Sequence, residues 1–293
     1  MINSQTPLGF IGLGIMGRYM AGHLLDDGFE MHLYNRTKQK ADELLKKGAN
    51  WQDSAGAVAQ CAHVIFTMVG TPSDVHEVYL GPGGLIEKAR PGSYLVDMTT
   101  SQPGLATRIY EAAKAKDLHA LDAPVSGGEK GAREAVLTVM VGGDSADFEA
   151  VAPLLKLIGN NVVHQGASGN GQHTKMCNQI VNANTIMGVA EGLAYAQAVG
   201  LDMDSVLRSI TTGSASSFHL SNTGPKMIAG DFDPGFAIHH MIKDLEIALK
   251  EANDLGLGLA GARCVLDRYR KLMAGGLGGD GIQAIYKLYR DRA

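Results

Sequence analysis

Short apolar runs alternate with helical patterns through the first half of the chain. Runs long enough for a buried strand occur at residues 8–13, 30–34, 63–69, 92–98 and 119–123. Apolar residues recur at helical spacing at residues 16–27, 38–47 and 105–116. Strands that alternate with helices in this way are typical of βαβ units, so the pattern predicts a doubly wound parallel sheet.

Two further strands are expected at the edge of this sheet. They lie at residues 137–141 and 161–164, and a helix at 148–158 is predicted to join them. Together these segments extend the α/β pattern to about residue 166.

The pattern changes near Gly166. Residues 172–199 contain no proline, and a helix of this length would extend about 40 Å, which is enough to link two domains. No strand-like alternation returns afterwards, and helices are predicted at 203–212, 222–229, 238–255 and 261–273, with a last helix after the glycines near 275–279. We therefore expect a Rossmann-type α/β domain at residues 1–166, joined by a long interdomain helix to an all-α domain at residues 167–293.

Composition narrows the class of protein. The 293 residues include 26 Lys and Arg and 30 Asp and Glu, giving a formal net charge of −4. With no long basic run, this balance argues against a nucleic-acid or acidic-membrane partner. Cys61, Cys177 and Cys264 lie far apart in no metal-ligand spacing, which predicts a reducing compartment and no metal site. With no signal-peptide pattern and no membrane-spanning apolar run, we expect a cytoplasmic protein.

A glycine motif, Gly12-Leu13-Gly14-Ile15-Met16-Gly17, stands between the first predicted strand and the first predicted helix. In this motif the first glycine permits a tight turn, the second lets the backbone approach a pyrophosphate, and the third lets helix and strand pack closely. The helix N-terminus then offers free N–H groups to the phosphates. A simple tight turn is the alternative, but the strand–turn–helix setting predicts a dinucleotide-binding loop.

The residues after the second predicted strand indicate which dinucleotide is bound. An acidic residue at this place would bind the ribose 2′-hydroxyl of NAD, but the chain has Asn35-Arg36-Thr37. The Arg36 guanidinium can make paired hydrogen bonds to a 2′-phosphate, with Asn35 and Thr37 as neutral donors. NADP(H) is therefore favoured over NAD(H), the alternative being that Arg36 is a solvated charge at a strand end.

A second glycine-rich segment, from Asp122 to Gly128, follows the fifth predicted strand. Ligands of doubly wound sheets bind at the carboxyl ends of the strands. The hydroxyl group of Ser126 and the backbone N–H groups of Gly127 and Gly128 could hold a substrate carboxylate there. The alternative is a glycine-rich loop with a capping serine.

Lys175 and Asn178 lie three residues apart near the start of the long helix, so their side chains project from one face. A lysine on a mostly apolar helix that faces another domain would be partly desolvated, which lowers its pKa and suits it to general acid–base chemistry. Asn178 could hold the same substrate oxygen. Taken alone, a helix lysine is more often a solvated side chain.

These three motifs, with Phe236 and the segment Lys243-Asp244-Leu245, resemble the β-hydroxyacid dehydrogenase family. That family includes 3-hydroxyisobutyrate dehydrogenases, tartronate semialdehyde reductases and glyoxylate/succinic semialdehyde reductases. The resemblance extends from about Leu8 to Leu288. It implies that Lys175 is the catalytic acid/base, and that Asn178 is its neighbour on the substrate.

The resemblance also implies the other site residues. The glycine loop at 12–17 would hold the cofactor, with further contacts from Met68, Val69, Thr100 and Lys243. Substrate would be bound by Ser126, Gly127, Gly128 and Phe236. The Asn-Arg-Thr segment resembles that of NADPH-using glyoxylate and succinic semialdehyde reductases more than that of NAD-using isobutyrate enzymes, which carry Asp.

Two positions depart from the family pattern. Many members have Asn-Asn where this chain has Asn178-Gln179, and Leu-Pro or Val-Ser where it has Val69-Gly70. Neither departure removes a proposed reacting group.

The expected activity is the interconversion of a short 3-hydroxy acid and its semialdehyde. The predicted partner is a small carboxylate-bearing aldehyde or hydroxy acid, and a homodimer or homotetramer is expected. One alternative is an imine-reductase-like enzyme, although such enzymes usually replace the helix lysine. Another is a non-catalytic binding module with a dehydrogenase fold, which retention of Lys175 and Asn178 disfavours.

Overall fold

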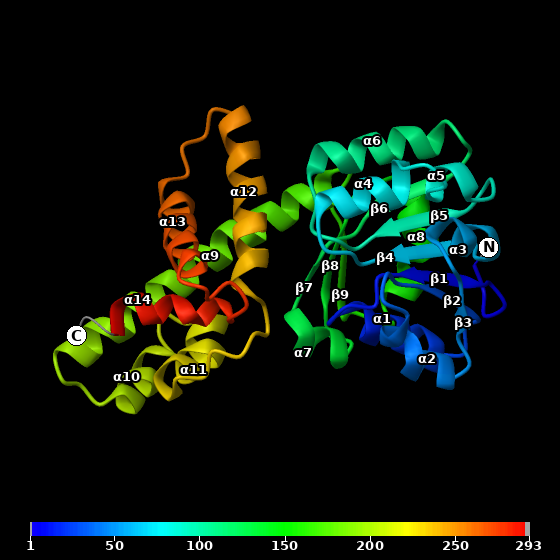
Figure 1. Cartoon of the computed structure of the whole chain (residues 1–293). Helices are drawn as coiled ribbons and strands as arrows, with labels where there is room; N and C mark the ends of the chain where they lie inside the picture. The colour runs from blue at the N-terminus through cyan, green and yellow to red at the C-terminus, as the bar shows by residue number, and fades with distance from the viewer. Residues whose placement is uncertain (1, 291–293) are drawn as a thin grey trace. The chain divides into compact units, whose positions relative to one another are not determined.

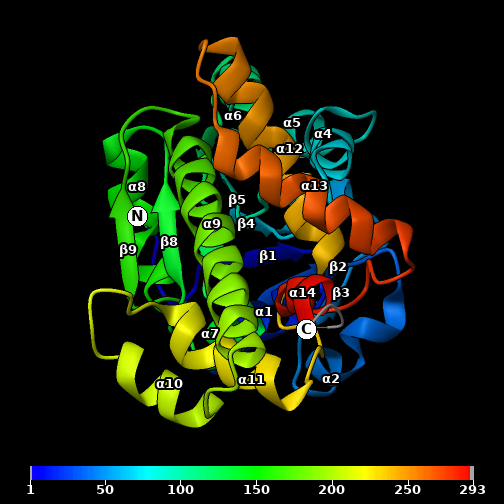
Figure 2. The ribbon, with the colours of Figure 1, turned by 90° about the vertical axis from the view of Figure 1, so that its left-hand side faces the viewer.

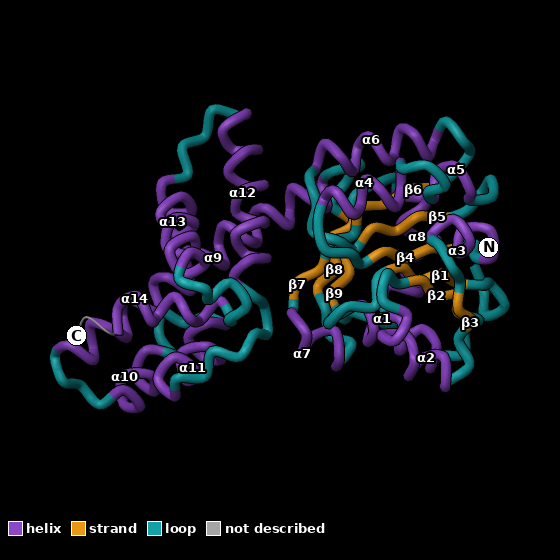
Figure 3. Tube along the Cα trace, in the orientation of Figure 1, coloured by secondary structure: helices purple, strands orange, loops and turns teal. Residues whose placement is uncertain are grey.

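The structure is a computed structural model that describes residues 2–290. The chain divides into two compact units between Lys175 and Met176. Strands lie in the first unit, and the second is built from helices (Figures 1 and 3). This division falls inside a long helix, whereas the sequence pattern placed the domain boundary at residues 166 and 167, so that boundary stays a prediction.

A six-stranded parallel sheet forms the centre of the first unit. Its strands are β1 (Leu8–Ile11), β2 (Met31–Tyr34), β3 (Asn50–Trp51), β4 (Val64–Thr67), β5 (Tyr94–Asp97) and β6 (His119–Asp122). The strand order is β3-β2-β1-β4-β5-β6. The order reverses between β1 and β4, and in such sheets a ligand binds beside the carboxyl ends of the strands at this switch point.

Helices cover both faces of this sheet (Figure 1). One face packs against α1 (Gly17–Asp26), α2 (Asp42–Lys46) and α8 (Ser145–Leu155). The other packs against α3 (Ala55–Cys61), α4 (Pro72–Leu80), α5 (Leu85–Lys88) and α6 (Pro103–Lys114). The predicted doubly wound Rossmann-type architecture is therefore confirmed.

The expectation of two edge strands was wrong. β8 (Thr138–Val141) and β9 (Asn161–His164) form a separate sheet with β7 (Val125–Ser126), in the order β7-β8-β9. An isolated antiparallel bridge between Asp122 and Gly142 relates this sheet to β6, and the Met140 N–H donates to the Pro124 oxygen beside it at 3.0 Å. The physical reason is Pro124, which stands between β6 and β7 and has no N–H group, so the ladder to β8 is interrupted there and resumes at Val125.

Several short elements escaped the sequence pattern. It missed β3, α3, α4 and α5, and the helix expected at 38–47 is a 3₁₀ turn (Lys38–Ala41) followed by α2. β3 has two residues, and α3 consists largely of small residues without a clear apolar stripe. Hydrophobic periodicity is weak in such segments.

In the described part of the second unit the regular elements are helices joined by loops, and an isolated bridge pairs Ala237 with Gly281. Its α-helices are α9 (Asn170–Ala198), α10 (Met203–Ile210), α11 (Gly224–Ala229), α12 (Ile238–Asp254), α13 (Ala260–Ala274) and α14 (Lys287–Arg290), with a π-helical turn (His219–Thr223) and a 3₁₀ turn (Ile282–Tyr286). The first unit contains one further short helix, α7 (Gly128–Arg133). α9 begins in the first unit and continues as one helix into the second (Figure 2). The predicted long helix and all-α second half are confirmed.

Candidate cofactor and substrate site

The glycine-rich turn follows β1, and its glycines meet different surroundings. Gly12 has φ +95°, and a Cβ there would overlap the backbone oxygen of Met68. A Cβ on Gly17 would overlap the backbone oxygen of Gly12. At Gly14, by contrast, a Cβ would find no atom within 4 Å. The fold therefore requires Gly12 and Gly17, whereas Gly14 leaves open space on the side where a pyrophosphate would approach.

The start of α1 also suits an anion. The helix has no side-chain hydrogen bond at its N-cap and no acidic residue in its first turn. Helices α3 and α4 in the same unit are capped by a side chain, from Ser54 and Thr71, whereas α6 is uncapped like α1. Uncapped N–H groups and the helix dipole favour a phosphate at this end of α1. The residues of the turn thus fit the dinucleotide that the sequence predicts.

Asn35 joins the end of β2 to this turn. Its Oδ1 accepts a hydrogen bond from the Leu13 N–H at 2.9 Å, and its Nδ2 donates to the backbone oxygen of Thr37 at 2.8 Å. The side-chain amide therefore fixes the path of the glycine loop. Its role as a donor to a 2′-phosphate stays a prediction, as does that of Thr37, which is exposed.

Arg36 lies on the surface beside the turn. Its side chain is 77% exposed, and its Nη1 lies 2.9 Å from Oδ1 of Asp74. Asp74 stands in the first turn of α4. Sequence reasoning missed this partner, because nothing in the pattern relates two residues 38 positions apart.

The predicted contacts Met68, Val69 and Thr100 gather at the same edge of the sheet. Met68 lies against Gly12, and the Val69 N–H donates to Oγ1 of Thr99 at 3.0 Å. Thr100 is half-buried directly after Thr99. The structure therefore brings the loops after β1, β4 and β5 together.

Two buried carboxylates lie at the ends of β5 and β6, where Asp97 is paired in register with Asp122. Oδ1 of Asp97 accepts hydrogen bonds from the Thr67 hydroxyl and the Thr99 N–H, at 2.9 and 3.0 Å. Burial raises the pKa of Asp97 to about 6. Burial likewise raises the pKa of Asp122 to about 6.

Asp122 holds the beginning of α9. Its Oδ1 accepts a hydrogen bond from the Gly169 N–H at 2.7 Å, and its Oδ2 accepts one from the Gln172 N–H at 2.8 Å. The Gln172 side chain in turn accepts from the Ser101 N–H and donates to the Thr99 oxygen, at 2.9 and 2.8 Å. Asp122 and Gln172 both stand in segments that the sequence singles out, but no sequence pattern indicates that they hold the start of α9.

Lys175 follows this anchored turn. It is 6% exposed, so the residue is largely withdrawn from solvent. Because α9 starts at the ends of β5 and β6, Lys175 belongs to the same edge of the sheet as the glycine-rich turn. Its role as the catalytic acid/base stays a prediction.

The predicted carboxylate loop connects β7 to α7. Gly127 and Gly128 have φ values of +137° and +62°, which L side chains rarely adopt. The next residue, Glu129, lies 3.2 Å from Nη2 of Arg18 and accepts a hydrogen bond from the Tyr19 hydroxyl at 3.2 Å. Ser126 and its two glycines are thus tied to α1, the helix that begins at the cofactor loop.

The remaining predicted residues lie in the second unit. Asn178 donates to Oε1 of Gln179 at 2.7 Å, and Gln179 donates to Oδ2 of Asp244 at 2.6 Å. Oδ1 of Asp244 lies 2.9 Å from Nζ of Lys243. Gln179, which departs from the family pattern, therefore links Asn178 to Lys243. Phe236 is half-buried and stacks on another ring of this unit, that of His240, with centroids 6.0 Å apart.

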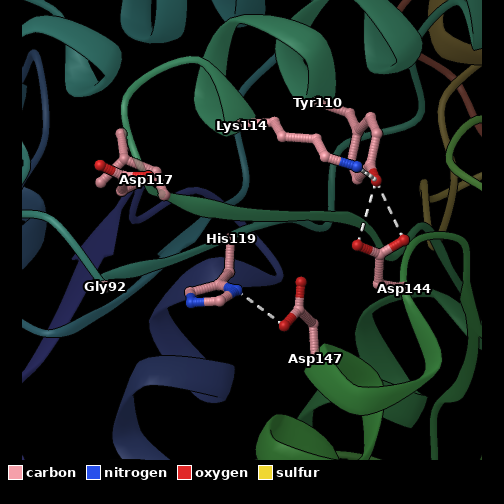
Figure 4. Close-up of a pocket in the computed structure, with 8 residues that line it drawn as sticks. Gly92, Tyr110, Lys114, Asp117, His119, Asp144 and Asp147 are labelled. Atoms are coloured by element: carbon pink, nitrogen blue, oxygen red, sulfur yellow. Dashed lines mark hydrogen bonds and ion pairs between the residues drawn. The ribbon is translucent and has the colours of Figure 1, made fainter.

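A pocket of about 440 Å³ lies at the other edge of the sheet, before β5 and β6 (Figure 4). Polar side chains dominate its lining: Tyr110, Lys114, Asp117, His119, Asp144 and Asp147. Four of these side chains form two pairs, with His119 2.7 Å from Asp147 and the Tyr110 hydroxyl 3.0 Å from both oxygens of Asp144. None of the predicted site residues lines this pocket.

Comparison with known proteins places the chain in a family. Residues 7–166 match the model of the NAD-binding domain of 6-phosphogluconate dehydrogenase. Residues 169–289 match the model described as the NAD-binding domain of NADP-dependent 3-hydroxyisobutyrate dehydrogenase. The chain is 40% identical to the 2-hydroxy-3-oxopropionate reductase of Escherichia coli, over 92% of each chain. The chain belongs to the β-hydroxyacid dehydrogenase family.

Other β-hydroxyacid dehydrogenases and their relatives match nearly the whole chain. An uncharacterized oxidoreductase of Bacillus subtilis is 54% identical over 97% of this chain and 99% of its own. The 3-hydroxyisobutyrate dehydrogenase of Mycobacterium tuberculosis, solved with L-serine, has a TM-score of 0.88 at 29% identity and covers 98% of this chain and 99% of its own. The family resemblance inferred from the motifs is confirmed.

Membership of the β-hydroxyacid dehydrogenase family makes the chain an NAD(P)-binding oxidoreductase. Across residues 2–290 we find no cluster of side chains suited to a metal ion. None of the helices in that range has the length and apolar character needed to cross a membrane.

Proposed function

We propose that this β-hydroxyacid dehydrogenase catalyses reversible hydride transfer between NADP(H) and a short 3-hydroxy acid or its semialdehyde, with Lys175 as general acid/base. The observation that carries the proposal is the burial of Lys175. This residue lies one turn after the hydrogen bonds by which Asp122 and Gln172 hold the beginning of α9. A buried amine beside the dinucleotide-binding edge of the sheet has the placement that acid–base catalysis on a bound substrate requires.

The chain's own groups divide the remaining work. The nicotinamide dinucleotide, when bound, supplies or accepts the hydride. The turn at Gly14 and the start of α1 bind the pyrophosphate, and Ser126 to Gly128 hold the carboxylate of the substrate. The Lys175 ammonium group gives a proton to the carbonyl oxygen during reduction, and the neutral amine takes it from the hydroxyl group during oxidation. Asn178 orients that oxygen.

The names of the relatives support a small carboxylate substrate. The E. coli relative is named for 2-hydroxy-3-oxopropionate, a semialdehyde with a carboxylate. The Mycobacterium relative was solved with L-serine, which carries a carboxylate and a 3-hydroxyl group. A loop of backbone N–H groups and one hydroxyl, such as Ser126 to Gly128, suits the carboxylate that both compounds share.

The preference for NADP(H) is supported by Arg36. No acidic residue directly follows β2 to bind a ribose 2′-hydroxyl, and the exposed guanidinium stands at that position. The family model that matches residues 169–289 is also described by an NADP-dependent enzyme.

The test is an absorbance assay at the nicotinamide band with NADPH and NADH. The aldehydes glyoxylate, succinic semialdehyde and tartronate semialdehyde are assayed with these reduced dinucleotides, and 3-hydroxyisobutyrate, which is already a hydroxy acid, is assayed with NADP⁺ and NAD⁺. We expect turnover with at least one of them and faster use of NADPH than of NADH. Lys175→Ala should lower kcat by about 10²- to 10⁴-fold while NADPH still binds.

The matched control is Lys156→Ala, which removes an exposed lysine from the first unit. Its kcat should equal that of the wild type. Near-normal turnover by Lys175→Ala would remove the proposed role of the amine. A flat trace for the wild type across the whole panel would contradict the substrate class.

A further inference from the structure

The ion pair between Arg36 and Asp74 joins two parts of the first unit that are not neighbours in the sheet. Arg36 follows β2, and Asp74 lies in α4, which follows β4. β1 stands between β2 and β4. The pair therefore crosses the carboxyl end of β1, at the point where the glycine-rich turn begins.

The two partners differ in how firmly they are held. Oδ2 of Asp74 accepts hydrogen bonds from the backbone N–H and the hydroxyl of Thr71, at 2.9 and 2.8 Å. The Asp74 N–H returns a hydrogen bond to Oγ1 of Thr71 and completes a capping box. The Asp74 side chain is 17% exposed, against 77% for Arg36. The carboxylate is thus fixed, and the guanidinium is the partner that can move.

A 2′-phosphate bound at Arg36 would compete with the carboxylate of Asp74. A 2′-phosphate bound by Arg36 needs N–H groups of the same guanidinium that donates to Asp74. The phosphate is itself negative, so it is also repelled by a carboxylate that binds the same cation. An NAD molecule brings a neutral hydroxyl group instead and leaves the ion pair undisturbed.

We propose that Asp74 is a specificity-determining residue that competes with the 2′-phosphate for Arg36 and so weakens the preference for NADP(H) over NAD(H). The proposal rests on the proposed role of Arg36 as the 2′-phosphate ligand. Exposed ion pairs are worth a few-fold in an equilibrium constant. Asp74 therefore moderates the preference and does not abolish it.

The experiment compares two adenine nucleotides that differ in the 2′-phosphate. Calorimetry measures the binding of 2′,5′-ADP and 5′-AMP to the full chain and to Asp74→Asn, which keeps a side-chain oxygen for Thr71. We expect Asp74→Asn to bind 2′,5′-ADP about fivefold more tightly and 5′-AMP unchanged. The gain should shrink at high salt, because the competing interactions are exposed.

Two further variants make the result specific. Asp26→Asn removes a carboxylate from another exposed ion pair, with Lys47, at the far end of α1, and should leave both affinities unchanged. In an Arg36→Gln background, Asp74→Asn should bring less than a twofold gain (about 0.4 kcal/mol) for 2′,5′-ADP, because no guanidinium remains to be released. If thermal melting shows that Asp74→Asn is unfolded, Asp74→Ser replaces it.

The outcomes separate this inference from the proposed function. Unchanged or weaker binding of 2′,5′-ADP by a folded Asp74 variant overturns the inference, and so does an equal gain for 5′-AMP. Equal binding of both nucleotides by the wild type contradicts the proposed NADP(H) preference. If Asp74→Asn then binds 2′,5′-ADP more tightly, the inference still stands.

Discussion

The glycines of the first turn show how one motif combines two requirements. A side chain at Gly12 or Gly17 would overlap backbone atoms, so those positions are fixed by the fold itself. Gly14 has open space where a side chain would stand, so the fold does not require glycine there. We attribute this glycine to the approach of the dinucleotide's pyrophosphate. Substitutions within one short motif should therefore affect different properties.

Gly14→Ala is expected to fold normally and to bind NADPH at least tenfold more weakly, because the added methyl group occupies the space that the pyrophosphate needs. Gly17→Ala is expected to destabilise the protein by about 1–3 kcal/mol, because the methyl group overlaps the oxygen of Gly12. Thermal melting and NADPH fluorescence titration of both variants measure the two effects. A large loss of stability in Gly14→Ala would contradict this division.

Side-chain contacts explain why part of the site could not be predicted. The glycine loop and Lys175 were identified because their residue types carry a recognisable function in sequence. Asp74 was not, since its contact with Arg36 depends on how α4 follows β4 in space. Asn35 was expected to face the cofactor, yet both groups of its amide bind the backbone.

At the level of elements, the start of α9 is the best-anchored part of the site. The two oxygens of Asp122 accept hydrogen bonds from two different N–H groups of the segment that opens the helix. Asp97 instead receives the hydrogen bonds of the Thr67 hydroxyl and the Thr99 N–H on one oxygen. The two carboxylates share burial, strand register and a raised pKa, but they differ in this pattern.

Asparagine should therefore replace Asp97 more readily than Asp122. In Asp97→Asn one carbonyl oxygen still accepts both hydrogen bonds. In Asp122→Asn an NH₂ group meets one of the two N–H donors, at a cost of about 1–3 kcal/mol. We expect a lower Tm for Asp122→Asn than for Asp97→Asn, and faster amide hydrogen exchange at residues 169–174 in Asp122→Asn alone. Equal Tm values and equal amide exchange for the two variants would show that the division of N–H donors between the carboxylate oxygens does not affect stability.

Periodicity predicted the long elements and failed for short ones. The helix at 170–198 was expected within two residues at its start and one at its end, because it is long and lacks proline. The placement of β8 and β9 was wrong, because strand patterning shows that a segment is extended but not which sheet it joins. Pro124 acts on that choice, because its missing N–H group interrupts the pairing between β6 and the segment that pairs with β8.

For the whole molecule, the two units carry buried titratable groups of opposite kinds. In the first unit, burial raises the pKa of Asp97 and Asp122 to about 6, so the folded state binds protons that the unfolded state releases above about pH 4. Their contribution to stability is present below about pH 4 and is lost as the pH rises through 6. In the second unit, burial lowers the pKa of His219 and His240 to about 4. Their contribution is present above about pH 6.5 and is lost as the pH falls toward 4.

Acidification from about pH 7 to pH 5 should therefore destabilise residues 176–290 relative to residues 2–175. Hydrogen exchange measured at both pH values, with rates corrected for intrinsic exchange, reports each unit separately. His219→Gln should reduce the acid sensitivity of the second unit, whereas His173→Gln, which replaces an exposed histidine, should not. A larger loss of protection in the first unit would show that other groups dominate.

Because α9 runs through both units, it affects how the first unit folds during synthesis on the ribosome. In an α-helix each carbonyl accepts from the N–H four residues later, so the carbonyls of residues 172–175 depend on residues 176–179. A nascent chain leaving the ribosome can form the hydrogen bonds that the Gly169 and Gln172 N–H groups donate to Asp122 while those four carbonyls still face water. Synthesis of the next turn completes the first unit, and a gene fragment cut at residue 175 would leave that turn permanently open.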